Sequence, residues 1–263
     1  MKQNTSHAVM AQRNVEDKDS FDDFPTPPWA TRALLEHVVA DKLHLRKQTC
    51  LEPACGQGHM AKVLSEYFGA VKASDIQGFG YGDRVDFLTA PYQVGQFDWV
   101  ITNPPFRLGE EFVLRGLSIA RVGVAILART VFIESVGRFE RIFKDNPPTV
   151  FAQFTERVPM VKGRLDRKAS TATGYAWLVW DKTSRRNSRL GWVPPCRKQL
   201  ERDSDYTVPE RPLPVSEGLF AVHQRPAIER GNVTETKKQA DLFGVANARG
   251  NSSDHETRDN EHN

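Results

Sequence analysis

Cysteine is scarce in this sequence, with three residues among 263. Cys50, Cys55 and Cys196 have none of the paired spacings that zinc ligands use, so no metal site is expected. The first two lie in an apolar stretch, where a free thiol packs as a small hydrophobic side chain. We therefore expect neither a disulfide framework nor a zinc framework.

Long apolar runs are missing too. No run reaches the length of about 18 apolar residues that a membrane-spanning helix needs. Residues 1–20 have neither the apolar core of a secretory signal nor the amphipathic, arginine-rich pattern of a transit peptide. We therefore expect a cytoplasmic protein without a membrane partner. The chain is long enough for one domain of enzyme size with a full core.

A strong net charge is also lacking, because the formal value is only +3. The charges are unevenly placed, however. From Arg157 to Arg202 there are twelve basic residues and three acidic ones. This stretch could face nucleic-acid phosphates, although a solvated protein surface has the same charge pattern.

The apolar segments predict alternating strands and helices. The predicted strands span 48–53, 70–76, 97–102, 122–129, 149–157 and 174–181, and the predicted helices span 29–40, 60–68, 110–120 and 131–143. A short segment at 85–88 precedes the strand at 97–102, and the last two strands are expected to form an antiparallel hairpin at the edge of the sheet. The predicted fold class is therefore α/β, with a doubly wound, mostly parallel, seven-stranded sheet.

Composition divides the chain into four parts. Residues 1–20 and 231–263 are polar and are expected to be disordered. Residues 21–182 form the predicted folded domain, which starts with Thr26 as the N-cap of a helix and prolines in its first turn. Residues 183–230 are a basic, proline-containing extension, expected to be irregular and to pack on the domain.

The segment LEPACGQGHMA, residues 51–61, predicts the end of a strand, a glycine turn and the start of a helix. Gly56 and Gly58 let the backbone approach a ligand closely, and the helix start offers free N–H groups. The spacing of these glycines and Ala61 also fits a dinucleotide fingerprint, which alone is weak evidence. A carboxylate at Glu52 would repel a diphosphate but would favour an ammonium or a sulfonium.

Two acids follow this motif. Asp75 ends the next strand about twenty residues after the glycines, where nucleoside-binding folds place an acceptor for the ribose hydroxyls. An aspartate that caps the following turn is the alternative. Asp86 and Phe87 offer an acceptor beside an apolar surface, which suits an exocyclic amine and an adenine ring, although an ordinary loop has the same pattern.

The strand FDWVIT runs directly into the rigid corner Asn103-Pro104-Pro105-Phe106. Together with the preceding motifs, this corner resembles the S-adenosylmethionine-dependent methyltransferases of exocyclic amines, and most closely the N6-adenine DNA methyltransferases. The resemblance covers roughly residues 24–180 and rests on five elements in the family's order. These elements are Thr26-Pro27-Pro28, Glu52-Pro53-Ala54-Cys55-Gly56, Asp75, Asp86-Phe87 and Asn103-Pro104-Pro105-Phe106.

The resemblance implies a class I methyltransferase fold, S-adenosylmethionine as cofactor and a flipped adenine in DNA as target. The implied catalytic residues are Asn103, Pro104, Pro105 and Phe106. The implied cofactor-binding residues are Thr26, Pro27, Glu52, Pro53, Ala54, Cys55, Gly56, Gly58, Asp75, Ile76, Asp86 and Phe87. Contacts to the target are expected from the loop 158–174 and from the basic extension, because the chain lacks the long recognition domain of larger members.

The corner suits this chemistry because an adenine N6 amine is a poor nucleophile. Its lone pair is delocalised into the ring, and two hydrogen-bond acceptors could draw the nitrogen toward tetrahedral geometry. The Asn103 side-chain oxygen and the Pro104 main-chain oxygen are the expected acceptors, held in place by the stiffness of proline. Phe106 would stack on the base, a contact worth about 1 to 3 kcal/mol.

Four alternatives remain at this stage. RNA adenine is the closest rival target. Enzymes that methylate glutamine side chains usually carry a tyrosine and a different glycine motif. A nucleic-acid-binding protein on the same fold without turnover would have no need of Glu52, Asp75, Asn103 and Phe106 together. An NAD-dependent enzyme is the most distant reading, because nothing after the strand 97–102 suits hydride transfer.

Overall fold

The fold is taken from a computed structural model, which describes residues 22–39, 42–184 and 187–206. These residues belong to one compact unit, Met1–Ala221, and the second unit, Val222–Asn263, lies outside them. The segments predicted to be disordered, 1–20 and 231–263, also lie outside the described residues, as does the extension beyond residue 206.

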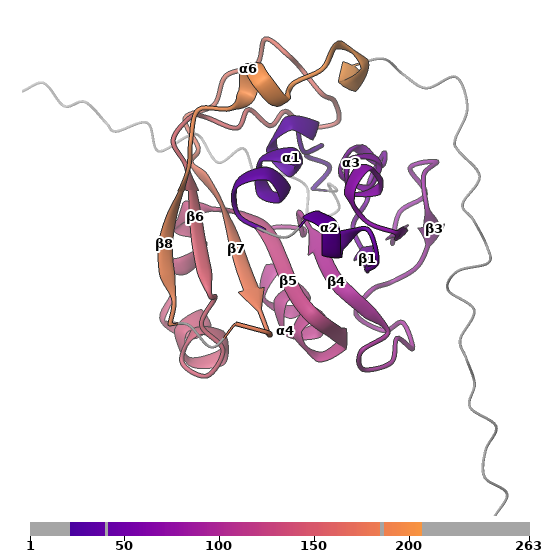
Figure 1. The fold of residues 1–263 in the computed structure, drawn as a ribbon, viewed down its shortest axis with the longest axis vertical. Coiled ribbons are helices and arrows are strands. Elements are labelled where there is room, and N and C mark those ends of the chain that lie inside the picture. Colours follow the sequence, from indigo (N-terminus) through magenta and orange to yellow (C-terminus); the bar gives the residue numbers. More distant parts are fainter. Residues whose placement is uncertain (1–21, 40–41, 185–186, 207–263) are drawn as a thin grey trace, which may run out of the picture. The chain divides into compact units, whose positions relative to one another are not determined.

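Eight strands of the described chain form one mixed sheet in the order β3-β2-β1-β4-β5-β7-β6-β8 (Figure 1). The strands are β1 (Thr49–Glu52), β2 (Ala70–Asp75), β3 (Asp83–Arg84), β4 (Phe97–Thr102), β5 (Ala120–Arg129), β6 (Val150–Phe154), β7 (Tyr175–Asp181) and β8 (Arg189–Val193). Only β7 runs antiparallel to its neighbours, β5 and β6. The predicted α/β class and the mostly parallel sheet are confirmed.

The edge of the sheet differs from the prediction. The antiparallel pair of β6 and β7 is present, but β8 pairs in parallel with β6 and takes the edge, so the described sheet has eight strands and not seven. The segment expected to be irregular therefore contains a strand. Most of β8 is exposed, so its sequence lacks the alternation that marks a strand with one buried face.

Helices cover both faces of the sheet. Helix α1 (Pro28–His37), the short α2 (Lys42–Leu45) and α3 (His59–Tyr67) lie on one side in Figure 1, and α4 (Gly109–Ile119) lies on the other. The predicted helix at 131–143 is instead three short pieces. These are the 3₁₀ helix η1 (Thr130–Ile133), α5 (Val136–Arg138) and the π-helix η2 (Phe139–Phe143).

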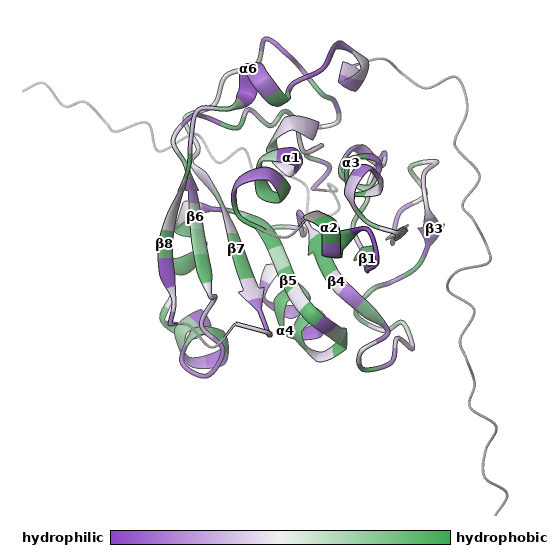
Figure 2. Ribbon diagram, in the orientation of Figure 1, coloured by the Kyte–Doolittle hydropathy of each residue, from purple (hydrophilic) through white to green (hydrophobic). Residues whose placement is uncertain are grey.

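The alternation of side chains along the central strands divides the core into two layers. Trp99 and Ile101 pack with α1 and α3, whereas Val100 between them packs with α4. The same alternation continues along β5 and β7, which are buried on both faces over most of their length, and β5 appears mostly green in Figure 2. Strands of this kind lie inside a three-layer α/β fold, so the sheet is a rigid platform for its carboxyl edge.

The cap of helix α1 lies one residue later than predicted, and the helix ends earlier, at His37. Pro27 holds the cap position, with no side-chain hydrogen bond to the helix, and Thr26 precedes it. The prolines explain the shift, because Pro28 at the first helical position has no N–H to be capped and a φ angle already suited to a helix. Thr26 is buried beside the carboxyl edge of the sheet instead.

The end of the described chain packs against α1 through a buried arginine. Arg32 donates two hydrogen bonds to the carboxylate of Asp205, at 2.9 Å each, and two more to Glu66 on α3. It also donates to the main-chain oxygen of Leu200, the last residue of α6 (Arg197–Leu200). A 3₁₀ helix, η3 (Asp203–Tyr206), completes this segment. The charged groups around Arg32 therefore attach residues 197–206 to the domain.

The parallel strands bring their carboxyl ends to one edge of the sheet. The strand order changes direction between β1 and β4, and in open α/β sheets ligands bind outside the strand ends at such a switch point. The two motifs singled out in the sequence follow these two strands. Within the described ranges, no helix is long and apolar enough to cross a membrane.

Candidate functional site

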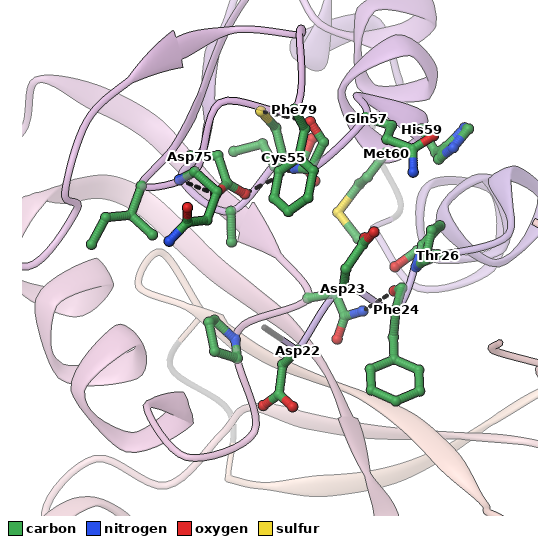
Figure 3. Close-up of a pocket in the computed structure, with 18 of the residues that line it drawn as sticks. Asp22, Asp23, Phe24, Thr26, Cys55, Gln57, His59, Met60, Asp75 and Phe79 are labelled. Atoms are coloured by element: carbon green, nitrogen blue, oxygen red, sulfur yellow. Dashed lines mark hydrogen bonds between the residues drawn. The ribbon is translucent and has the colours of Figure 1, made fainter. Parts of the chain in front are cut away.

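A cavity of about 380 Å³ lies outside the carboxyl ends of β1, β2 and β4. Its wall includes the carboxylates of Asp22, Asp23, Glu52 and Asp75, with Arg107 as the only lysine or arginine that lines it in the described chain. We call it the acidic cavity. Figure 3 shows Asp22, Asp23 and Phe24 on one side of it and Asp75 and Cys55 on another.

The glycine turn after β1 forms one wall of the acidic cavity. Gly56 has a φ angle of 51°, which favours glycine, and it lines the cavity. Gly58 has a φ angle of 82° and does not line the cavity. A Cβ atom at position 58 would lie 2.4 Å from the ring of Tyr81. Gly58 is therefore needed for packing against Tyr81 and for the start of α3, whereas Gly56 leaves room for a ligand.

Glu52 is the most deeply buried of the four acids. Its side chain is 2% exposed, and its Oε2 atom has no hydrogen-bond partner. Burial raises the pKa of this carboxyl well above its ordinary value, and the negative charge of Asp75 raises it further, while the backbone N–H of Ala61 at the start of α3 opposes the rise. A buried carboxylate oxygen without a partner, on a cavity wall, favours a ligand that brings a hydrogen-bond donor or a positive charge.

Asp75 at the end of β2 braces the same wall. Its Oδ2 atom accepts the N–H of Gly56 at 2.9 Å, and its Oδ1 atom accepts the N–H of Gln77 at 2.8 Å. Both interpretations of the sequence thus apply: the aspartate caps the following turn, and it lines the cavity with acceptor capacity left on each oxygen. Ile76, next to it, exposes 53% of its surface on the cavity wall.

Residues 22–25 run along the opposite wall and fix the orientation of Asn103. The Asn103 Nδ2 atom donates to the main-chain oxygen of Phe24 at 3.1 Å. A carbonyl can only accept, so this contact requires the amide nitrogen to face Phe24 and turns the Oδ1 atom away from it. No described residue donates a hydrogen bond to Asn103 Oδ1 or to the Pro104 main-chain oxygen. The corner therefore presents two unused acceptors.

A second cavity, of about 350 Å³, lies on the other side of the corner. Pro104, Pro105 and Phe106 line it together with apolar residues that include Leu127 and Phe132, and we call it the apolar cavity. Pro105 lines both cavities. No acidic side chain of the described chain lines the apolar cavity.

Phe106 has three contacts that hold it at this wall. Its N–H donates to Asp22 Oδ2 at 2.9 Å, and its ring lies 5.3 Å from that of Phe24, centroid to centroid. The guanidinium of Arg129, at the end of β5, lies 4.0 Å from the ring centroid, a cation–π contact. Arg129 also forms a hydrogen bond with the Tyr175 side chain, which opposes the rise that burial causes in the pKa of Tyr175.

Two other groups on the acidic cavity are uncharged near neutral pH. Burial lowers the pKa of His59 to about 4, with the charge of Lys62 adding to the effect. Burial raises the pKa of the Cys55 thiol, and the charges of Glu52 and Asp75 raise it further, so this cysteine is a poor nucleophile. Positive charge in the cavity is thus limited to Arg107, and its field is dominated by carboxylates. The described residues contain no cluster of side chains placed to hold a metal ion.

The structure brings most of the residues singled out in the sequence to these two cavities. Those at the acidic cavity are Thr26, Glu52, Ala54, Cys55, Gly56, Asp75, Ile76, Asn103 and Pro105, and those at the apolar cavity are Pro104, Pro105 and Phe106. Pro27, Pro53, Gly58, Asp86 and Phe87 line neither.

Asp86 and Phe87 have structural roles where they lie. The Asp86 carboxylate accepts the Leu88 N–H and the Thr89 hydroxyl, each at 3.0 Å, so it caps a turn. Phe87 is 2% exposed and packs 4.9 Å from the ring of Phe112 in the layer under α4. These contacts of Asp86 and Phe87 are those of an ordinary loop, the alternative given for this pair in the sequence.

No pattern in the sequence marks the residues that complete the site. Asp22, Asp23 and Phe24 precede the first helix in a polar segment, and only the fold brings them against the corner and the glycine turn. The main-chain oxygen of Asp23 also accepts the N–H of Gly163 at 2.8 Å, which joins this segment to the loop after β6. Arg129 ends a buried strand, and nothing in the sequence separates it from other surface arginines.

No protein family matches the sequence, and no curated protein matches it either. Solved structures do resemble the fold. A methyltransferase subunit of a type I restriction-modification system from Streptococcus thermophilus aligns with a TM-score of 0.50 at 12% identity, over 70% of this chain and 51% of that one. A modification subunit ascribed to a type I restriction enzyme from Vibrio vulnificus has a TM-score of 0.45 at 15% identity. This alignment covers 76% of this chain and 51% of that one.

A protein from Pyrococcus horikoshii, described as an RNA methyltransferase, aligns with a TM-score of 0.46 at 18% identity, over 61% of this chain and 87% of that one. The chain thus spans about half the length of the two restriction-modification subunits. The likeness to the subunit from Streptococcus thermophilus shows the fold, which is the Rossmann-like fold of class I methyltransferases. At such identities the substrate must be argued from the site itself.

Proposed function

We propose that this chain is an S-adenosylmethionine-dependent methyltransferase that modifies the N6 amine of an adenine flipped out of DNA. The acidic cavity is the proposed site of the cofactor, and the apolar cavity is the proposed site of the target base. The corner 103–106 lies between them and provides the catalytic groups. Its two unused acceptors, Asn103 Oδ1 and the Pro104 main-chain oxygen, are the observation that carries the proposal.

The residues of the acidic cavity fit S-adenosylmethionine. This cofactor carries an ammonium, a sulfonium and a carboxylate, so a site with four acids suits its positive charges. The Oε2 atom of Glu52, which has no hydrogen-bond partner, would accept a hydrogen bond from the ammonium, and Asp75 would accept hydrogen bonds from the ribose hydroxyls. The apolar side chains of Ile76 and Phe79 on the same wall suit the faces of the adenine ring.

The cofactor supplies an electrophilic methyl group when bound, and the chain supplies the rest. Asn103 Oδ1 and the Pro104 oxygen each accept one N–H of the target amine, which localises the nitrogen lone pair. The nitrogen would form its bond to the methyl carbon as the bond from that carbon to sulfur breaks, so the positive charge passes to the nitrogen. The cationic nitrogen is acidic and would release its proton through an accepting oxygen to water, so no side-chain base with a raised pKa is needed. The contact of Asn103 Nδ2 with the Phe24 oxygen keeps the amide from turning over, so its oxygen stays available.

The apolar cavity suits a nucleobase. Phe106 and Phe132 provide aromatic surface, and Pro104 and Pro105 provide a rigid edge next to the two acceptors. A base inside a duplex cannot reach this edge, so the target must leave the stack. Arg129 would then lie beside both the base and its backbone, because it contacts the Phe106 ring and lines the apolar cavity.

RNA adenine remains the second candidate target. One solved structure that resembles the fold is described as an RNA methyltransferase, and a corner that reads only the amine and the ring face does not distinguish the two nucleic acids. The choice of DNA rests on the sequence motifs of the corner and of the glycine turn.

One labelling experiment tests the proposal. The purified full chain is incubated with tritiated S-adenosylmethionine and, in separate reactions, with mixed-sequence duplex DNA, total RNA and a protein extract. The labelled products are digested and identified by chromatography. The expected product is N6-methyladenine from DNA. Label in RNA alone would replace the target, label in protein alone would contradict the role of the apolar cavity, and no binding of the cofactor would remove the proposal altogether.

A further inference from the structure

Two groups of arginines in the described chain differ in their partners. One group lies in the loop after β6 and in the C-terminal segment, where the charge pattern had suggested contacts to the target. The other lies at the carboxyl ends of β5 and β6, next to the apolar cavity. The inference below rests on the proposed function, because it concerns how the nucleic acid that carries the target base is held.

The first group is largely neutralised by neighbouring acids. Arg167 pairs with Asp203 at 2.7 Å and with Glu201 at 3.4 Å, and Arg197 pairs with the same Glu201 at 3.1 Å. Arg202 pairs with Glu66 at 3.0 Å, and the exposed Arg164 pairs with Asp166 at 3.3 Å. These pairs join the loop, the end of the described chain and the domain, so phosphates would have to displace carboxylates to reach most of these guanidiniums.

The second group consists of Arg129 and Arg157, which form no ion pair with any described residue. Both are exposed. Arg157 donates to the main-chain oxygen of Ala172 at 3.0 Å, and Arg129 lies on the ring of Phe106. Glu156, the acid next to Arg157 in the sequence, accepts the N–H groups of Cys196 and Arg197 at 2.8 and 2.6 Å, so its charge is directed to the start of α6.

Arg129 and Arg157 line a third cavity, of about 560 Å³, which we call the polar cavity. Thr130, Gln153 and Thr173 supply further hydrogen-bonding side chains there, and no carboxylate of the described chain lines it. The polar and apolar cavities share Arg129 and Val131, so they are adjacent at the end of β5. The Nε2 atom of Gln153 already donates to the main-chain oxygens of Phe154 and Tyr175, so the two arginines and the two threonine hydroxyls are the donors that remain for a ligand. A positively charged hollow of this kind matches a phosphate better than it matches a base.

The backbone around this cavity is closely packed, which fixes the position of the arginines. The Thr130 N–H donates to the Gly174 oxygen at 3.0 Å, so the end of β5 is joined to the start of β7. A Cβ atom at position 174 would lie 3.2 Å from the Thr130 side chain and 3.5 Å from the Arg157 guanidinium. A side chain at position 174 would therefore crowd Thr130, whereas its contact with Arg157 would be an ordinary one.

We propose that the polar cavity binds the DNA backbone phosphate next to the flipped adenine, through Arg129 and Arg157. The base enters the apolar cavity, and the adjoining phosphate lies across the shared wall at Arg129. Arg157 then holds the strand at a point where it touches neither the base nor the cofactor. In this arrangement the unpaired arginines, and not the C-terminal basic stretch, supply the main phosphate contacts.

The test measures duplex binding by the full chain, without methyl transfer. A fluorescein-labelled duplex of mixed sequence is titrated by anisotropy at salt concentrations from about 50 to about 200 mM, where each phosphate contact contributes to the salt slope. Arg157→Gln is expected to weaken binding about tenfold and to make the log–log salt slope less negative by about one. Arg157→Lys keeps the charge and should keep the slope.

Arg164→Gln is the matched control, because Arg164 is an exposed arginine of the first group and is paired with Asp166. This change should alter the affinity less than about twofold. Three results would each overturn the inference. They are a salt slope in Arg157→Gln equal to that of the wild type, a loss of affinity in Arg164→Gln as large as in Arg157→Gln, and no duplex binding by the wild-type chain. Tighter binding of an RNA duplex with the same Arg157 dependence would keep the phosphate site and overturn DNA as the target. Duplex binding with the expected slopes but no methyl transfer would overturn the proposed function and leave the phosphate site intact.

Discussion

The two sides of the corner 103–106 differ in charge. The acidic cavity on one side is lined by four carboxylates and one arginine, whereas the apolar and polar cavities on the other side are lined by arginines and by no carboxylate of the described chain. Pro105 contributes to both sides. Pro105 thus lies between a cavity lined mainly by acidic charges and cavities whose charged residues are arginines.

This difference suits a reaction between a cation and part of a polyanion. A ligand with a sulfonium is attracted to one side, and a phosphate backbone is repelled from it and attracted to the other. In the proposed function the reacting groups meet at the corner, whose residues line both sides. The product that remains after methyl transfer has lost the sulfonium charge, so the acidic cavity should hold it less strongly than the cofactor.

The strongest test of this separation removes the corner group that faces the acidic side. Asn103→Ala is expected to lower kcat about 10² to 10³-fold, because one of two acceptors for the target amine is lost. The affinity for S-adenosylmethionine should change little, since Glu52 and Asp75 are untouched. Single-turnover kinetics measures the first quantity and calorimetry the second.

Asn146→Ala serves as the control, because Asn146 is an exposed asparagine outside all three cavities and should leave kcat unchanged. If Asn103→Ala instead abolished cofactor binding and left the rate of the bound enzyme intact, Asn103 would belong to the cofactor site and the corner would need another catalytic group.

A second change alters the acidic side alone. Glu52→Gln should weaken the binding of S-adenosylmethionine about tenfold to hundredfold, because an amide replaces a buried charge that faces a cation. The same change should raise the Tm of the ligand-free chain, because the wild-type carboxylate is buried with an unpartnered oxygen. Glu111→Gln, an exposed control, should do neither.

The pH dependence of Glu52 follows from the direction of its pKa shift. The folded chain raises this pKa above the ordinary value of 4.5, so the protonated form is favoured in the fold. The stability that the protonated Glu52 carboxyl contributes is fully present below pH 4.5. It is lost as the pH rises through the raised pKa of the folded chain. The stabilisation by Glu52→Gln should therefore grow with pH, and Tm scans of both chains across the acid to neutral range measure it. A difference in Tm that shrinks as the pH rises would contradict this assignment.

The sequence predicted the central part of the molecule because its signals are local there. The buried strand over 97–102, the glycine turn at 56 and the proline corner each specify their own backbone, and β4 has the predicted bounds. The same is true of the cavity wall at Glu52 and Asp75, since the ends of neighbouring parallel strands meet at one edge.

What the sequence could not predict depends on long-range contacts. Asp22 and Phe24 reach the corner through single hydrogen bonds to residues about eighty positions away. Phe87 was expected beside a ligand but packs in the core, because an aromatic residue after an aspartate fits either place. The exposed edge strand β8 carried no periodic pattern, and the pairing of the C-terminal arginines required the acids of residues 201–205 to fold back on the domain.

A third change alters the apolar side alone. Phe106→Leu should raise the KM for DNA about tenfold, because the aromatic face that stacks on the base is lost together with the Arg129 contact. The affinity for the cofactor should stay the same, since Phe106 does not line the acidic cavity. Phe139→Leu, at an exposed phenylalanine of η2, is the control. A loss of cofactor affinity in Phe106→Leu would mean that the two sides are not independent.

The smallest expected effect separates the two groups of arginines. Arg167→Gln should change the affinity for duplex DNA less than about twofold, because Glu201 and Asp203 already balance this charge and a paired surface arginine contributes little to distant phosphates. The change should instead lower the Tm slightly, since the pair helps to join the loop after β6 to the C-terminal segment. Anisotropy titrations beside Arg157→Gln compare the two sites directly. A salt slope that falls by about one in Arg167→Gln would show that the carboxylates give way to phosphates, and the boundary of the basic side would then extend to the C-terminal segment.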